Sequence, residues 1–84
     1  MTSGFQITCA NKNQNGTIVR VGGPGWSLSR REAVQKIVGN QIRLHIYIGD
    51  VAFDIGVRGE GDAAFLVLEP DAKDLSDVDG LHSC

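Results

Sequence analysis

The sequence predicts a single small α+β domain with the element order β-β-α-β-β-β, in which one helix packs across a mainly antiparallel sheet. Three observations lead to this prediction: short segments in which apolar and polar residues alternate, one segment of helical periodicity behind a capping signal, and eleven glycines against two prolines in 84 residues. A chain of this length has room for one domain, which we expect to span residues 1–84.

The first two strands are predicted at residues 5–9 and 17–21, where apolar and polar residues alternate. A two-residue turn between them would place Cys9 opposite Gly22, and a three-residue loop would place it opposite Val21. Only the second register keeps one face of the pair apolar, so the sequence favours the three-residue loop.

A helix is predicted at residues 30–38, after a connecting segment at residues 22–28. Ser29 and Glu32 have the spacing of a capping box, and Gly39 is the expected left-handed stop. Nine residues form a marginal helix in water, so this helix must pack on the sheet to exist.

The best-specified element is a hairpin of residues 41–48 and 51–58, joined by a type II′ turn at Gly49-Asp50. This register pairs Ile48 with Val51 and places eight apolar side chains on one face. The opposite face collects Arg43, His45, Tyr47, Ala52, Asp54, Gly56 and Arg58.

A third strand of this meander is predicted at residues 63–68, which are apolar on both sides. One side should meet the helix, and the other should be covered by a partner or by the tail, through Leu75, Val78 and Leu81. The segment 71–84 is acidic and is expected to be partly irregular, with its last residues mobile. The expected core consists of Phe5, Ile7, Val19, Val21, Val34, Ile37, Ile42, Leu44, Ile46, Phe53, Ile55 and Val57.

The amino-acid composition argues against several classes of function. Eight basic and ten acidic residues give a net charge of −2, which argues against nucleic acid or a membrane as the partner. Cys9 and Cys84 form no metal-binding motif, and no apolar run suits a signal peptide or a membrane span. We therefore expect a cytoplasmic protein with two free thiols and neither metal nor cofactor, a Cys9–Cys84 disulfide being the alternative.

One cluster on the polar face of the predicted hairpin resembles a chemical site. His45 lies opposite Asp54, with Arg43 and Tyr47 nearby, and a carboxylate can orient an imidazole as a general base. A flat sheet offers no pocket, and no serine or cysteine is placed as a nucleophile, so a solvated polar face or a recognition surface fits better than catalysis. The candidate binding residues are Arg43, His45, Tyr47, Asp54 and Arg58, with Trp26 as a further contact if it is exposed.

Several short motifs follow one another in an order that resembles that of a known family. V-G-G at residues 21–23, W-S-L-S at 26–29 and E-A-V at 32–34, followed by the Gly39 stop and a strand meander, resembles the DUF3892 family of small bacterial proteins of unknown function. The similarity covers about residues 7–71, and the closing cysteine matches a family feature, whereas the acidic stretch before it departs from that pattern. The resemblance implies no activity and is consistent with a stand-alone bacterial or phage-borne module.

The favoured function is a non-catalytic protein-binding module, and an open strand edge makes a homodimer plausible. The alternative is a phage- or mobile-element-encoded inhibitor whose acidic tail occupies a host nucleic-acid-binding defence protein. A third hypothesis is a small enzyme or ligand binder that uses His45 and Asp54.

Overall fold

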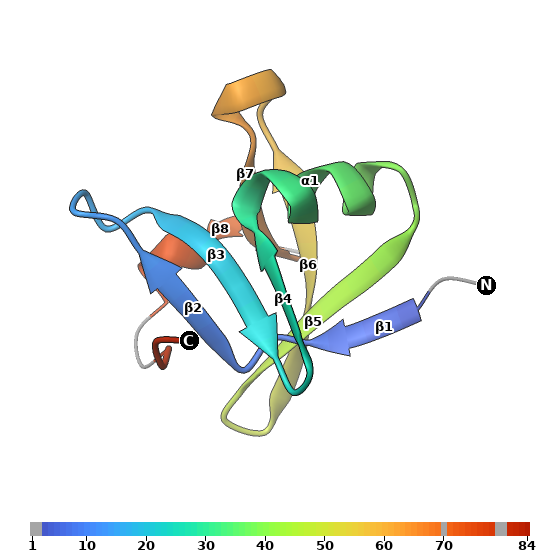
Figure 1. Ribbon diagram of the computed structural model, residues 1–84. Helices are drawn as coiled ribbons and strands as arrows, with labels where there is room; N and C mark the ends of the chain where they lie inside the picture. Colours follow the sequence, from blue (N-terminus) through green and yellow to red (C-terminus); the bar gives the residue numbers. More distant parts are fainter. Residues whose placement is uncertain (1–2, 70, 79–80) are drawn as a thin grey trace.

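The computed structural model describes residues 3–69, 71–78 and 81–84 (Figure 1). Within these ranges the strands lie in two sheets, one of five strands in the order β1-β5-β6-β7-β8 and one of three in the order β2-β3-β4. The elements are β1 (Ser3–Gln6), β2 (Cys9–Lys12), β3 (Ile18–Gly23), β4 (Trp26–Ser29), α1 (Arg30–Val38), β5 (Ile42–Ile48), β6 (Val51–Arg58), the 3₁₀ helix η1 (Gly61–Ala63), β7 (Phe65–Glu69), β8 (Lys73–Asp74) and the 3₁₀ helix η2 (Leu75–Asp77). The predicted α+β class is confirmed.

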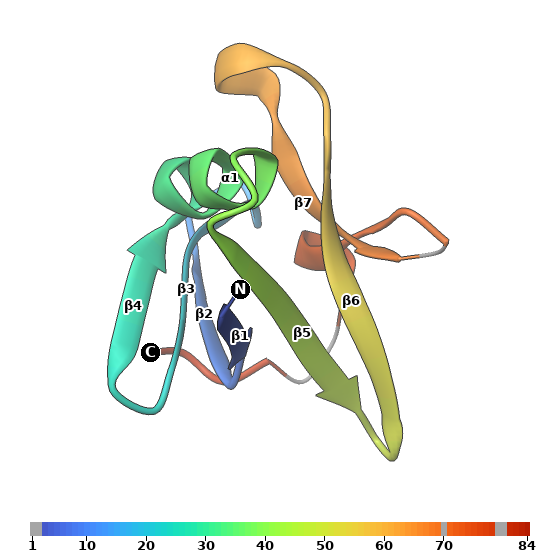
Figure 2. The same cartoon turned by 90° about the vertical axis from the view of Figure 1, so that its right-hand side faces the viewer.

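The two sheets and the helix surround one core. Figure 2 shows β2, β3 and β4 on one side of the molecule, β5, β6 and β7 on the other, and α1 across one end. All strand pairs are antiparallel except β1 with β5. The largest fully buried side chains come from both sheets, from the link between β1 and β2 and from η2: Ile7, Val21, Leu44, Val67 and Leu75. None of the helices in the described ranges has the length and apolar character of a membrane span.

The strand predicted at residues 5–9 is two strands in different sheets. The Ile7 amide donates to the His45 carbonyl at 2.8 Å, and the Thr8 amide donates to the Gly22 carbonyl at 2.9 Å. The chain therefore passes from the large sheet to the small one between two adjacent residues. Because it lies between the sheets, Ile7 is almost completely buried.

The predicted pairing of Cys9 with Val21 is wrong, because Cys9 lies opposite Gly22. A bulge interrupts the pairing of β2 with β3 and leaves Val19 as an extra residue in β3. Ile18 is consequently buried, whereas Val19, which was expected in the core, is 39% exposed.

The connecting segment predicted before the helix is strand β4, which pairs with β3. Pro24 and Gly25 form the turn, and Gly25 has the positive φ of 78° that the second central residue of a type II turn requires. Gly23 lies opposite Trp26, and a Cβ atom at Gly23 would stand 2.5 Å from the indole Nε1. Gly23, one of the glycines that were expected to end the strand, thus allows an aromatic ring to lie close to the backbone.

Helix α1 has the predicted bounds and the predicted capping box. The Ser29 amide donates to Glu32 Oε1 at 3.0 Å, and the Glu32 amide donates to Ser29 Oγ at 3.1 Å. The predicted left-handed stop at Gly39 is wrong: its φ is −79°, its amide still donates to the helix, and Asn40 is the left-handed residue with φ 58°.

The β5–β6 hairpin has the predicted register at its turn end, where Ile48 pairs with Val51 and His45 with Asp54. Gly49 has the positive φ of 62° expected at the first central position of a type II′ turn. The next strand, β7, begins at Phe65 rather than at residue 63, because η1 comes first.

The described part of the tail packs into the domain. Leu75 is fully buried and Val78 is 5% exposed, and both belong to the main core. The Ile18 amide donates to Ser76 Oγ at 2.9 Å, which joins η2 to the small sheet. One side of β7 was expected to be covered either by a partner or by the tail. The structure shows that the tail covers it.

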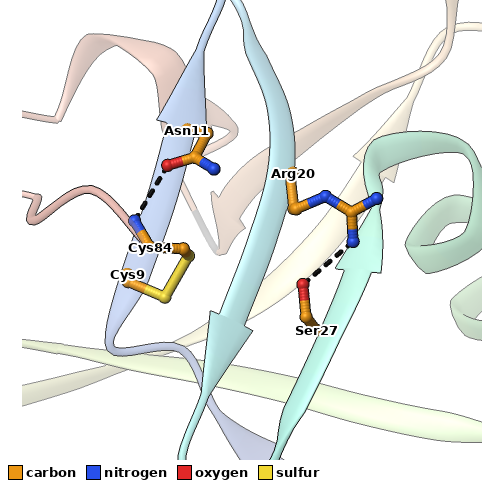
Figure 3. Close-up of a disulfide and its surroundings, with 5 residues drawn as sticks. All are labelled: Cys9, Asn11, Arg20, Ser27 and Cys84. Atoms are coloured by element: carbon orange, nitrogen blue, oxygen red, sulfur yellow. Dashed lines mark hydrogen bonds between the residues drawn. A yellow bond between two sulfur atoms is a disulfide. The ribbon is translucent and has the colours of Figure 1, made fainter.

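The two cysteines form a disulfide, so the expectation of free thiols is wrong (Figure 3). The closing segment runs beside β2, where the Ala10 amide donates to the His82 carbonyl and the Cys84 amide donates to Asn11 Oδ1, each at 2.8 Å. These backbone contacts bring Cys84 to Cys9, although the two residues stand at opposite ends of the sequence.

Candidate functional site

Five of the six predicted site residues lie on one face of the β5–β6 hairpin, and four of the five form one group. Arg43, His45 and Tyr47 alternate along β5, and Asp54 lies directly opposite His45 on β6. The His45 and Tyr47 rings meet edge to face, with centroids 5.9 Å apart and planes at 84°. Strand periodicity therefore brings these four side chains together as predicted.

His45 and Asp54 are neighbours on this face without a direct polar contact. Among the hydrogen bonds and ion pairs of the described residues, none joins their side chains. The grooves found in the described residues lie elsewhere, and no three His, Cys, Asp or Glu side chains of the described ranges gather as metal ligands. What the face offers is a set of exposed polar and aromatic groups for contact.

Arg58 lies apart from this group, at the far end of β6. Its Nη1 atom stands 2.9 Å from Glu69 Oε1 and also donates to the Val57 carbonyl at 3.0 Å. The Glu69 side chain passes over Gly56 to reach it, since a Cβ atom at Gly56 would meet the Glu69 carboxylate. Arg58 thus has a structural contact that the sequence pattern did not reveal.

Trp26 belongs to the small sheet and is half-buried. Its ring centroid lies 5.6 Å from that of Phe5, and both rings pack against the core. Trp26 therefore covers the edge of the core.

The end of the hairpin exposes apolar side chains on both of its faces, a feature that sequence reasoning missed: Tyr47 lies on the polar face, and Ile48 and Val51 pair on the opposite face. Tyr47, Ile48 and Val51 are 53%, 38% and 55% exposed. We call residues 47–51 the hairpin tip. Ile48 and Val51 were assigned to the core face, and they do pair on that face, but the hairpin extends past the core on the side away from α1 (Figure 2). Alternation reports which face a residue occupies, not how far the core reaches.

A groove of about 800 Å³ lies at the other end of the molecule, between α1 and the β6–β7 connection. We call it the α1–η1 groove. Its lining includes Val34, Val38, Val57 and Ala64, and Val38 is 67% exposed. Charged side chains also line it: Arg30 and Arg31 from the helix, and Glu60 and Asp62 from the connection. Its walls are distant in sequence, so periodicity gave no signal for it.

The fold and these surfaces define a small α+β domain with two exposed regions that contain apolar side chains, the hairpin tip and the α1–η1 groove. The chain belongs to the DUF3892 family, described as a protein of unknown function, whose profile matches residues 6–74. The resemblance found in the sequence is therefore confirmed. Searches of the curated proteins and of the solved structures give no match to this chain.

Proposed function

We propose that this protein is a non-catalytic protein-binding module that contacts its partner through the hairpin tip and the adjoining side chains of Arg43, His45 and Asp54. The observation that carries the proposal is the joint exposure of Tyr47, Ile48 and Val51. Single exposed apolar residues are ordinary, but several gathered around one turn, with polar residues beside them on one face, are typical of an interaction site.

The chemistry of the tip suits a protein partner. Tyrosine is enriched among residues that dominate binding energy, since its ring buries a large area while its hydroxyl keeps a hydrogen bond. The tip is a two-stranded turn with a fixed register, so little ordering entropy is lost when it docks. Arg43, His45 and Asp54 supply charged and polar groups at the rim, which favour the correct partner over others.

The test is site-specific photo-crosslinking in a lysate of the cells that make the protein. A benzophenone amino acid at position 47 should yield one dominant crosslinked protein, and the same probe at position 19 should not. Val19 is a suitable control because it is also an exposed apolar strand residue, 39% accessible, outside the tip. Equal crosslinking patterns from the two positions would refute the proposal.

The inhibitor hypothesis, in which the acidic tail occupies a host nucleic-acid-binding protein, has weaker support. A tail that acts as bait must be free to leave the domain, and Leu75 and Val78 are buried in the core. A bacterial or phage-borne origin remains part of that hypothesis. Catalysis by His45 and Asp54 has no supporting contact between the two side chains.

A cytoplasmic location is likewise a proposal, and the disulfide makes it testable. Disulfides persist in oxidising compartments and are rare in a reducing cytosol. Rapid alkylation of the protein in intact cells should label both cysteines if it resides in the cytoplasm. Protection of both thiols would place it in an oxidising environment instead.

A further inference from the structure

The hairpin tip and the α1–η1 groove are apolar surfaces of opposite shape. The tip is a narrow turn that projects beyond the core, with Ile48 and Val51 exposed. The groove is a hollow whose apolar lining includes Val34 and Val38. Each exposes to water the kind of surface that the other could cover, so docking would remove apolar area from both.

One copy of the chain cannot join its own tip to its own groove. Strand β6 begins at Val51 in the tip and reaches the groove at Val57, so the two surfaces are about 20 Å apart at the usual rise of a strand. Figures 1 and 2 agree that the tip points away from α1 and η1. The rigid sheet keeps the surfaces apart, and the groove that could receive a tip belongs to a second copy.

The charges at the two surfaces favour one orientation. Arg31 Nη2 lies 3.5 Å from Asp62 Oδ1 across the groove, an exposed ion pair. Arg30 is half-buried beside it, and none of the hydrogen bonds and ion pairs in the described residues involves its side chain. Asp50, at the turn of the tip, supplies a carboxylate for that guanidinium. Glu60 lines the groove from the β6–β7 connection and would repel Asp50, so the turn must face α1.

We propose that this chain associates head to tail with a second copy of itself, the hairpin tip of one copy entering the α1–η1 groove of the next, with Asp50 against Arg30. The inference rests on the proposed function for the tip and adds the groove as its receptor. Such an interface is heterologous, because each copy uses a different surface, so it generates rings or open chains and not an isologous dimer.

The interface is tested with two variants that each remove one half of it. The tip variant is Ile48→Thr with Val51→Thr, which keeps β-branched residues in the strands. The groove variant is Arg30→Glu with Val38→Gln, which keeps good helix formers and places an acid in the first turn of α1. Val19→Thr is the matched control, since Val19 is exposed but belongs to neither surface.

Sedimentation velocity over a range of concentrations gives the outcome. The wild type and Val19→Thr should self-associate as concentration rises, whereas each interface variant alone should stay monomeric. An equimolar mixture of the two variants should form a dimer and nothing larger, because it contains one intact tip and one intact groove. A monomeric wild type, or a mixture that stays monomeric while the wild type associates, would overturn the proposal. Circular dichroism of each variant confirms that it is folded.

A charge exchange tests the orientation separately. Asp50→Arg and Arg30→Glu should each weaken association, and the chain that carries both substitutions should recover it, with a gain that falls as salt is added. Additive losses in the double variant would overturn the Asp50–Arg30 contact. If self-association fails while position 47 still crosslinks to a different protein, this inference is wrong and the proposed function stands.

Discussion

Cys84, the last residue of the chain, is bonded to Cys9 in β2, with their Cα atoms 4.9 Å apart although the two residues are 75 positions apart in the sequence. The bond lies against the small sheet, since a Cβ atom at Gly22 would stand 3.1 Å from Cys9 Sγ and 3.3 Å from Cys84 Sγ. The disulfide thus holds residues 81–84 against β2. Together with the buried side chains of Leu75 and Val78, it fixes the tail to the domain.

Removing the disulfide should destabilise the protein strongly. A crosslink that closes a loop of this length lowers the entropy of the unfolded chain, and the loop-closure relation gives about 4.5 kcal/mol for it. We expect the Cys9→Ser, Cys84→Ser double variant to lose roughly that much free energy of unfolding, measured by urea denaturation. Wild type reduced with dithiothreitol is the control and should lose a similar amount. Equal stability of oxidised and serine proteins would show that the bond contributes nothing.

Gly23 should not tolerate a side chain. A Cβ atom there would meet the Gln6 carbonyl oxygen and stand 2.5 Å from Trp26 Nε1, so Gly23→Ala forces the backbone or the indole to move. Overpacking of this kind costs about 1–3 kcal/mol. Gly4→Ala is the matched control, because nothing lies within 4 Å of its added Cβ. Thermal unfolding of the two variants should separate them, and identical midpoints would contradict the packing described for Trp26.

The tail should contribute more to stability through its buried apolar residues than through an exposed charge such as that of Asp71. Leu75 is fully buried, so Leu75→Ala should cost about 2–5 kcal/mol, whereas exposed Asp71→Ala should change stability by less than about 0.5 kcal/mol. Chemical denaturation measures both. If Leu75→Ala were as harmless as Asp71→Ala, the tail would be free to act as the inhibitor hypothesis requires.

The capping box should make stability depend on pH. The Ser29 backbone amide, and next the Ser29 hydroxyl, hold the pKa of Glu32 below its ordinary value, with Arg20 and Lys36 adding smaller effects. A carboxyl with a depressed folded pKa stabilises the protein above its unfolded pKa of about 4.3, and this contribution is lost as pH falls through the folded value. Glu32→Gln keeps a capping amide without the charge. Wild type should therefore be the more stable of the two near neutral pH, with the gap closing in acid; a gap that is constant with pH would contradict this.

Local signals allowed a good part of the fold to be predicted. The helix from residue 30 to 38 and the pairing of His45 with Asp54 both depend on residues that are close in sequence, in one case a capping box and in the other a two-residue turn. The family was recognisable for the same reason, because its motifs are short and local.

Two of the failures are local irregularities that periodicity does not reveal. Trp26 lies in a strand with its ring close to Gly23, and Val19 is exposed because a bulge shifts the register of β3. The other failures depend on packing between segments that are distant in sequence. The disulfide requires the last residues to run beside β2, which no spacing of two cysteines reveals. Exposure of the hairpin tip depends on where the core ends, and the α1–η1 groove depends on two elements that are remote in sequence.

We propose that the hairpin tip is the surface through which this protein contacts another protein. The decisive measurement is to immobilise the wild type, the Ile48→Thr, Val51→Thr variant and the Val19→Thr control, and to quantify the proteins each retains from source-cell lysate. The wild type and the control should retain the same partner, and the tip variant, equally stable by urea denaturation, should lose it. Undiminished retention of that partner by the folded tip variant would show that the tip is not the contact surface.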